Sequence, residues 1–255
     1  MTFTASIVAA TLGERPYKYF ESVPSTMDAA REWLLEGALS GSMVIADQQT
    51  AGRGRMGRVW VAPDRCALAM SVVMRVKVHW LSQVAMLGGL VVADALVKIG
   101  VSDVRLKWPN DVLIGRRKVA GILAESEWDG SNLRGAILGI GVNFAGDFST
   151  SELNAQAVSI TSALGHEPDP AAFFAHLIAA YDARTSQLGT PALFETWRSK
   201  LWTIGQKVRV ESSPPVDGIA EDVSPLGALM VRSVDGRLHT VMAADVKVWP
   251  VEGTT

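Results

Sequence analysis

The sequence has few of the residues that build disulfides, metal centres and nucleophilic active sites. Its single cysteine, Cys66, excludes an internal disulfide and a multi-cysteine zinc cluster. The four histidines lie far apart and show no metal-ligand spacing: His79, His166, His176 and His239. Cys66 has no histidine near it in the sequence, so a Cys-His or Ser-His-Asp set is not indicated. A GxxxxGK(S/T) motif is also missing, which argues against hydrolysis of the P-loop type.

An excess of positive charge and a long apolar segment are missing as well. The 24 lysines and arginines face 26 aspartates and glutamates, a net charge of −2, so general nucleic-acid binding is not favoured. The first 17 residues have no basic stretch before their short apolar run and make a poor signal peptide. The longest apolar stretch, residues 84–97, carries Asp94 and is too short to span a bilayer. We therefore expect a cytoplasmic protein with no membrane partner.

The composition is that of a folded chain with both helices and strands. Of the 255 residues, 48% are hydrophobic and 20% are charged, which suffices for a sizeable core. Apolar spacing predicts helices at residues 27–38, 80–100 and within 170–201, the first capped by Ser25 or Thr26. Strands are predicted at 42–47 and 67–76, and antiparallel hairpins within 104–144. Short β-like runs after residue 204 predict a small antiparallel barrel. The fold class is α+β, with a mainly antiparallel sheet in residues 1–204 and the barrel in 205–255.

Positive charge is concentrated in one segment, "QQTAGRGRMGRVW" at residues 48–60. Arg53, Arg55 and Arg58 supply fork-shaped donors that match carboxylate or phosphate oxygens. The interleaved glycines let the backbone approach a ligand closely, and no acid lies between residues 51 and 63. A solvated loop and an RNA-binding arginine–glycine segment are the alternatives. We favour anion binding over both together by roughly two to one.

Two further segments indicate a narrow pocket beside this loop. "RRKVAGILAE" places Lys118 at the start of an apolar strand that contains Gly121. "LGIGVN" places Gly139 and Gly141 on one face of another strand, where two missing side chains leave a slot. "KWPND" at residues 107–111 offers a cation, an amide and a carboxylate, although Pro-Asn-Asp is also common in turns. Each segment alone is explained by ordinary packing, and together they suggest a flat pocket.

The segments "STMD", "QQTAGRGRMGRVW", "KWPND", "RKVAGILAE" and "GIGVN", in this order and spacing, resemble those of the biotin–protein ligases. The resemblance covers residues 17–145 by motif and the rest by pattern. It implies a class II synthetase-like catalytic domain with a C-terminal SH3-like barrel. It also implies that biotin is activated with ATP and Mg²⁺ to biotinyl-5′-AMP and transferred to one lysine of a biotin carboxyl carrier protein. No tightly bound prosthetic group is implied, and a homodimer is left open.

The resemblance also implies a role for each matching residue. The biotin-binding residues would be Ser25, Thr26, Met27, Gln49, Gly52, Arg53, Gly54, Arg55, Lys118, Gly121, Leu123, Gly139 and Gly141. The ATP-binding residues would be Arg55, Arg58, Trp60, Lys107, Asn110, Lys118 and Asn143. The catalytic residues would be Arg55, Lys107, Asp111 and Lys118, with Asp111 as the magnesium ligand.

Two other functions compete with this interpretation. A lipoate–protein ligase shares the adenylate chemistry, but the arginine-rich loop together with "KWPND" favours biotin. A nucleic-acid-binding module would need a basic C-terminal barrel, whereas residues 205–255 hold five lysines and arginines against seven acids, a net charge of −2. About 24 residues precede Ser25, too few for a helix-turn-helix domain, so we do not expect repressor activity.

The loop departs from many relatives at Met56, where a further arginine is common. One fewer cation weakens the hold on an anionic adenylate, so we predict that Met56→Arg slows release of biotinyl-5′-AMP. Dissociation of labelled adenylate from both proteins measures this directly. Equal off-rates would contradict the prediction.

We expect the C-terminal barrel to help dock the carrier domain or to close over ATP. A chain that lacks residues 205–255 should therefore fail to transfer biotin to a carrier protein. Incorporation of labelled biotin into the carrier is the measurement, and full transfer by the shortened chain would exclude both roles.

Overall fold

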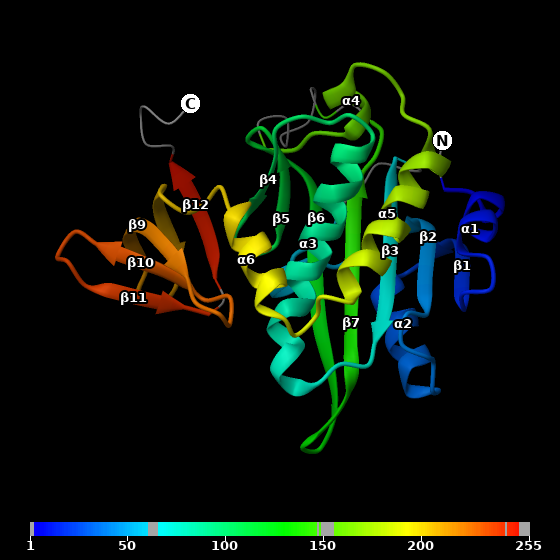
Figure 1. The fold of residues 1–255 in the computed structure, drawn as a ribbon, viewed down its shortest axis with the longest axis horizontal. Helices are drawn as coiled ribbons and strands as arrows, with labels where there is room; N and C mark the ends of the chain where they lie inside the picture. Colours follow the sequence, from blue (N-terminus) through cyan, green and yellow to red (C-terminus); the bar gives the residue numbers. More distant parts are fainter. Residues whose placement is uncertain (1–2, 61–65, 147, 149–155, 243, 250–255) are drawn as a thin grey trace.

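The computed structural model describes residues 3–60, 66–146, 148, 156–242 and 244–249. Its centre is a seven-stranded sheet in the order β1-β2-β3-β7-β6-β5-β4 (Figure 1). The strands are β1 (Tyr17–Val23), β2 (Met43–Gln49), β3 (Ala67–Met74), β4 (Val104–Lys107), β5 (Asp111–Ile114), β6 (Arg117–Asp129) and β7 (Asn132–Asn143). Only the β1–β2 pair is parallel among these strands, so the described sheet is mainly antiparallel, as predicted.

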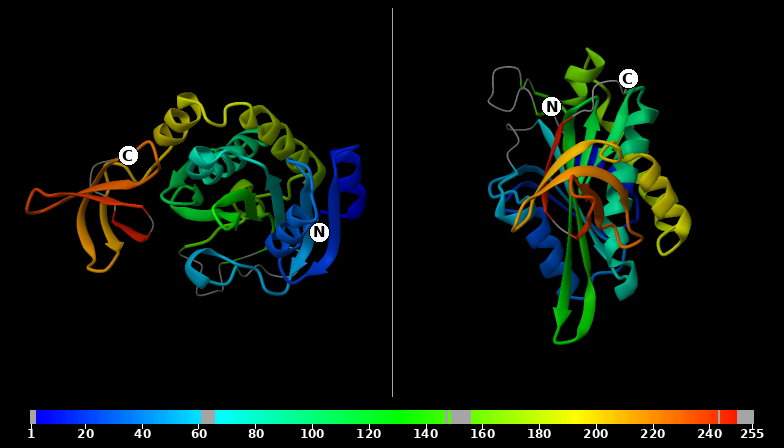
Figure 2. Two further views of the ribbon diagram at one scale, coloured as in Figure 1. Left: turned by 90° about the horizontal axis from the view of Figure 1, so that it is seen from below. Right: turned by 90° about the vertical axis from the view of Figure 1, so that its left-hand side faces the viewer.

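Helices cover both faces of the large sheet, because its inner strands alternate buried side chains toward each face. On β2, Val44 packs with α2 (Thr26–Leu35) while Ile45 packs in the larger core on the other side. That larger core is covered by a layer of helices along one side of the sheet (Figure 2). The layer consists of α1 (Ala5–Leu12), α3 (Leu81–Lys98), α5 (Pro170–Thr185) and α6 (Pro191–Ser199). Gly88 lets α3 approach the sheet, because a Cβ there would lie 2.8 Å from the side chains of Ile122 and Leu138.

The apolar helical segment is longer than the sequence indicated. Val78–Lys98 has the length and composition to cross a membrane, whereas we expected only residues 84–97 to be apolar. In the fold, most of this segment is buried, and α3 packs between α5 and the strands. Its apolar character is therefore accounted for by the core.

Most predicted elements are confirmed. α2, α3, α5 and α6 lie where helical spacing placed them, and Pro170 and Pro191 stand at the first positions of their helices. The turns between β5 and β6 and between β6 and β7 contain Gly115 and Gly130, both with positive φ. The sequence interpretation missed α1, β1 and the short helix α4 (Ile160–Leu164).

The C-terminal residues form a second, smaller sheet at one end of the molecule (Figure 1). Its antiparallel strands run in the order β11-β10-β9-β8-β12. They are β8 (Lys207–Glu211), β9 (Val216–Val223), β10 (Leu229–Ser233), β11 (Leu238–Val241) and β12 (Asp245–Trp249). The small antiparallel sheet is confirmed. Its closure into an SH3-like barrel, and the boundary at residue 205, stay predictions.

Trp108 joins this C-terminal sheet to the large one. Its side chain is 1% exposed, and its indole N–H donates to the carbonyl oxygen of Gly227 at 2.8 Å. Its backbone N–H donates to the hydroxyl of Thr203 at 2.9 Å. Arg198 of α6 adds an ion pair to Asp222 of β9 at 2.6 Å. Since residues 107–111 also line a cavity, Trp108 couples the position of the C-terminal sheet to that cavity.

We predict that Trp108→Phe lowers the free energy of unfolding by about 1–3 kcal/mol, because the Gly227 carbonyl loses its donor in a buried contact. Urea denaturation followed by circular dichroism measures the change. The control is Trp128→Phe: Trp128 is 41% exposed, and its indole N–H donates to the hydroxyl of Ser126 two residues away. We expect that control to change stability by less than about 0.5 kcal/mol. Equal stability of Trp108→Phe and the wild type would contradict the proposed anchor.

Candidate functional site

A cavity of about 980 Å³ lies between the large sheet, the arginine–glycine loop and the C-terminal sheet. All but two of the residues that the sequence assigned to a site line it. The exceptions are Ser25 and Gly52. Ser25 is 1% exposed at the N-cap of α2, where its hydroxyl makes no capping hydrogen bond. The carbonyl oxygen of Gly52 accepts a hydrogen bond from the backbone N–H of Trp60 at 2.9 Å. Gly52 therefore supports a residue of the cavity wall.

The floor of the cavity is made by glycines on β6 and β7. Strand pairing sets Gly121 opposite Gly141, and Leu123 opposite Gly139. The ring of Trp60 covers the first pair, because a Cβ on Gly141 would lie 2.8 Å from its Cε2. The side chain of Met27 packs on Gly139, where a Cβ would lie 2.5 Å from its sulfur. The missing side chains therefore make room for two walls, and the slot lies between them.

One end of the slot carries a fixed amide. The Oε1 of Gln49 accepts hydrogen bonds from the backbone N–H of Thr26 at 2.8 Å and from its hydroxyl at 2.9 Å. The hydroxyl of Ser71 in turn donates to that of Thr26 at 2.8 Å. Because both contacts use its carbonyl oxygen, the Gln49 side chain is held in one orientation beside the slot.

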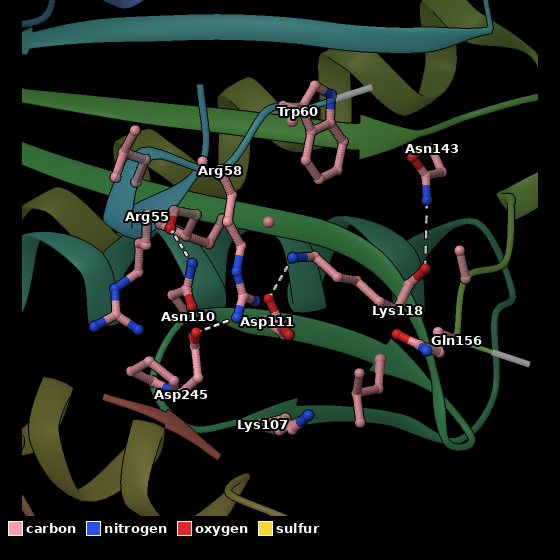
Figure 3. A pocket seen from close by; sticks show the side chains of 18 of the residues that line it. Arg55, Arg58, Trp60, Lys107, Asn110, Asp111, Lys118, Asn143, Gln156 and Asp245 are labelled. Carbon is pink, nitrogen blue, oxygen red and sulfur yellow. Dashed lines mark hydrogen bonds and ion pairs between the residues drawn. The ribbon is translucent and has the colours of Figure 1, made fainter. Parts of the chain in front are cut away.

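Lys118 reaches over the floor toward Asp111. The two are 2.6 Å apart, Nζ to Oδ1, and the ammonium lies 5.5 Å from the centre of the Trp60 ring (Figure 3). A register shift between Val112 and Leu113 marks a β-bulge where β5 pairs with the start of β6. Bulges change the direction of nearby side chains. The backbone of Lys118 is fixed on the other side by Gln156, whose carbonyl accepts its N–H at 2.7 Å.

Two asparagines predicted to face a nucleotide hold the strands that carry Lys118. Asn110 donates its amide N–H to the carbonyl of Ile122 at 2.7 Å. Asn143 donates to the carbonyls of Lys118 and Val158, both at 3.3 Å. Lys107, which pairs with Asp111 across β4 and β5, lines the cavity beside them (Figure 3). These side-chain hydrogen bonds of both asparagines therefore stabilise the strands.

The three arginines of the loop have different surroundings, although no acid lies near them in the sequence. Arg53 pairs with Asp28 and Glu125 at 2.8 and 3.1 Å. Arg58 pairs with Asp245 of β12 (Figure 3). Arg55 lies 3.5 Å from the carbonyl of Ala244. Burial lowers the pKa of Arg55, and the nearby carboxylates of Asp245 and Asp111 partly oppose this shift.

The loop itself is a tight turn. Arg53 and Val59 form an isolated antiparallel bridge, and the N–H of Gly54 donates to the carbonyl of Arg58 at 2.7 Å. Met56 stands at its tip with φ 55°, a left-handed conformation that costs a non-glycine residue about 1 kcal/mol. The turn directs Arg55 and Arg58 toward the C-terminal sheet.

The C-terminal sheet supplies cavity residues that the sequence interpretation missed. They are Glu211, Asp245, Val246, Lys247, Val248 and Trp249. Alternation along β12 places the polar residues Asp245 and Lys247 on one face. This alternation can be recognised in the sequence. It does not show which face of the strand meets a site almost 190 residues earlier in the chain. Within the described ranges, no group of three or more His, Cys, Asp or Glu side chains could hold a metal ion.

Comparison with known proteins identifies these motifs. Residues 19–143 match the model of the "Biotin/lipoate A/B protein ligase family", and residues 203–249 match that of the "Biotin protein ligase C terminal domain". A biotin protein ligase from Aquifex aeolicus, solved in complex with biotin and ATP, superposes with a TM-score of 0.77 at 23% identity. The match covers 92% of this chain and 99% of that one, and shows a shared fold.

Two curated proteins are closer in sequence. The biotin–[acetyl-CoA-carboxylase] ligase of Mycobacterium tuberculosis is 36% identical over 82% of this chain and 79% of its own length. That of Paracoccus denitrificans is 35% identical over 83% of this chain and 92% of its own length. At this identity and coverage, and with both domain models matched, the chain belongs to the biotin protein ligase family.

Proposed function

We propose that this protein joins biotin to the α-phosphate of ATP, with release of pyrophosphate, to form biotinyl-5′-AMP, and then transfers biotin to a lysine of a biotin carboxyl carrier protein. The observation that carries the proposal is the position of Lys118, whose ammonium lies above the paired glycines, against Trp60 and beside Asp111. A flat apolar slot that ends at a cation suits a ring system with a carboxylate tail. The names of the relatives support biotin as that molecule and acetyl-CoA carboxylase as the source of the carrier.

The slot is the proposed biotin site. Met27, Leu123 and Gly139 would contact the ring system, and Gln49 would present its amide to a polar group of the ring. Trp60 was expected on the nucleotide side. Because its ring covers Gly121 and Gly141, we now propose that it is a wall of the biotin slot.

The chemical problem in the first step is the meeting of two anions. A carboxylate and a phosphate about 4 Å apart repel by about 4 kcal/mol at an effective dielectric near 20, which is about a thousandfold in rate. Lys118 at the end of the slot and Arg55 in the loop would neutralise both groups at this point. Lys118 is held in advance by Asp111, and Arg55 contacts the carbonyl of Ala244 at 3.5 Å, so little reorganisation is needed.

The second step is attack of the carrier lysine amine on the acyl carbon of the adenylate, with release of AMP. Asp111 would accept the amine proton or orient the amine, and these two roles remain alternatives. Once biotin carboxylate and phosphate occupy Lys118, Asp111 loses its partner at 2.6 Å and becomes available to the amine.

Magnesium is part of the proposal. The carboxylates of the cavity suit a magnesium ion that enters together with the nucleotide, and they do not suit a permanently bound one. Three carboxylates line the cavity in the described part of the chain, and each pairs with a cation: Asp111 with Lys118, Asp245 with Arg58, and Glu211 with Lys247. Mg²⁺ in nucleotide sites is bound by one or two carboxylates plus substrate phosphates. Asp111 is the carboxylate that would complete such a site, and the ion would shield the phosphate charge.

The cytoplasm remains the proposed location. The low cysteine content and the use of ATP and a carrier protein as substrates support it.

Exchange of labelled pyrophosphate into ATP tests the first step. We predict biotin-dependent exchange in the wild type and a loss of at least about a hundredfold in Lys118→Ala, because one pre-placed charge is worth about 3–4 kcal/mol in such a site. Arg55→Ala should also be strongly impaired. Lys98→Ala, an exposed lysine at the end of α3, is the control and should exchange normally.

Lipoate is tested as the parallel substrate, because the matching family model includes lipoate ligases. Exchange with lipoate alone would keep the mechanism and reject biotin. Exchange with neither acid would reject the proposed reaction.

A further inference from the structure

Arg53 lies in an ionic network that is unlike the surroundings of Arg55 and Arg58. Its guanidinium contacts two carboxylates from different elements, Asp28 of α2 at 2.8 Å and Glu125 of β6 at 3.1 Å. The side chains of Arg53 and Glu125 are 34% and 28% exposed, so the contact is partly shielded from water. Ion pairs in such a position lose less strength to solvent than exposed pairs do.

A second arginine contacts the same two acids and a third one. Arg31 of α2 lies 2.5 Å from Glu125, 3.1 Å from Glu127 and 3.4 Å from Asp28. The network thus holds two arginines and three carboxylates, a net charge of −1. Because acids outnumber the cations, Arg53 has no unbalanced positive charge to offer to a substrate anion.

The network lies at one end of the slot because of strand geometry. Side chains two residues apart on β6 share a face, so Gly121, Leu123, Glu125 and Glu127 follow one another along it. The first two belong to the floor of the slot, and the third holds Arg53. On α2, Asp28 directly follows Met27, which packs on Gly139. The two elements that form the slot therefore also hold the base of the loop.

The position of Arg53 also determines the position of Trp60. Arg53 bridges to Val59 across the base of the turn, and the N–H of Trp60 bonds to the carbonyl of Gly52. A displacement of Arg53 would therefore move the backbone that places the Trp60 ring over the floor.

We propose that Glu125 is a positioning residue: with Asp28 and Arg31 it anchors the arginine–glycine loop through Arg53, so that, of the three loop arginines, only Arg55 and Arg58 face the substrate anions. The proposal rests on the proposed function where it concerns retention of the adenylate, but the anchor itself is independent of it. Arg53, assigned above to biotin binding by resemblance, acts on the ligand through the position of the loop and of Trp60.

Trypsin measures the anchor without any substrate, because it cleaves after arginine and the loop has three arginines. In Glu125→Gln we expect cleavage after Arg53, Arg55 and Arg58 to be about fivefold faster than in the wild type. The reason is that the loss of one partly shielded ion pair lets the loop open to the protease more often. Glu127→Gln is the matched control, since Glu127 pairs with Arg31, whereas Arg53 pairs with Asp28 and Glu125. It should cleave at close to the wild-type rate. Fragment masses identify the bonds, and urea midpoints show whether both variants are equally folded.

A double variant tests whether Glu125 acts through Arg53. Arg53→Gln and the combination of Arg53→Gln with Glu125→Gln should be cleaved after Arg55 at the same rate, because the second change has no partner left. Additive effects would overturn the anchor, and so would wild-type cleavage of Glu125→Gln.

The functional consequence is measured separately. Glu125→Gln should raise the KM for biotin and the rate of biotinyl-5′-AMP release about fivefold, with kcat at saturation changed much less, because Lys118 lies outside the loop and stays beside Asp111. Faster cleavage with unchanged KM and release would overturn the positioning role. Absence of biotin-dependent exchange in the wild type would instead count against the proposed function, while the cleavage result would still decide the anchor.

Discussion

The pairing of β6 with β7, which sets Gly121 opposite Gly141, is the constraint on which the rest of the site depends. Two adjacent positions without side chains on one face of a sheet leave a flat area that an indole ring can cover. The ring of Trp60 covers this area, and the backbone of Trp60 forms the end of the arginine–glycine loop. The same face of β6 then supplies Leu123 for the slot and Glu125 for Arg53. One strand register therefore fixes the floor, a wall and the attachment of the loop.

Three of the cations that line the cavity are held in ion pairs with its three carboxylates in the described part of the chain. Lys118, Arg58 and Lys247 each face a carboxylate that also lines the cavity. Unpaired cations in a partly buried site would repel one another and lose hydration, and the carboxylates relieve both costs in the free protein. Anionic substrates can take over these cations without leaving them uncompensated at any stage. This arrangement explains how a chain with a net charge of −2 can present several cations in one place.

The C-terminal sheet takes part in the site through its attachment as well as through its residues. Trp108 lines the cavity together with Lys107 and Asp111, and its indole N–H also donates to the carbonyl of Gly227. Asp245 and Lys247 of β12 meet the cavity because this attachment holds their sheet beside β4 and β5. A five-residue segment therefore serves the cavity and joins the two sheets at once.

The sequence by itself determined most of the elements and the part of the site that lies in the motifs. Helical spacing placed α2, α3, α5 and α6, because local propensity and burial agree there. The residues assigned from the motifs make up 17 of the 35 that line the cavity, since each motif is a short stretch with a distinctive residue pattern. Tertiary structure alone decided which charges meet. The acids that hold Arg53 and Arg58 are 25 to 187 residues away in the chain, and sequence proximity carries no signal over such distances. It also decided that Trp60 covers the glycines and that β12 faces the cavity, because strand register and the attachment of one sheet to another arise only when the whole chain is packed.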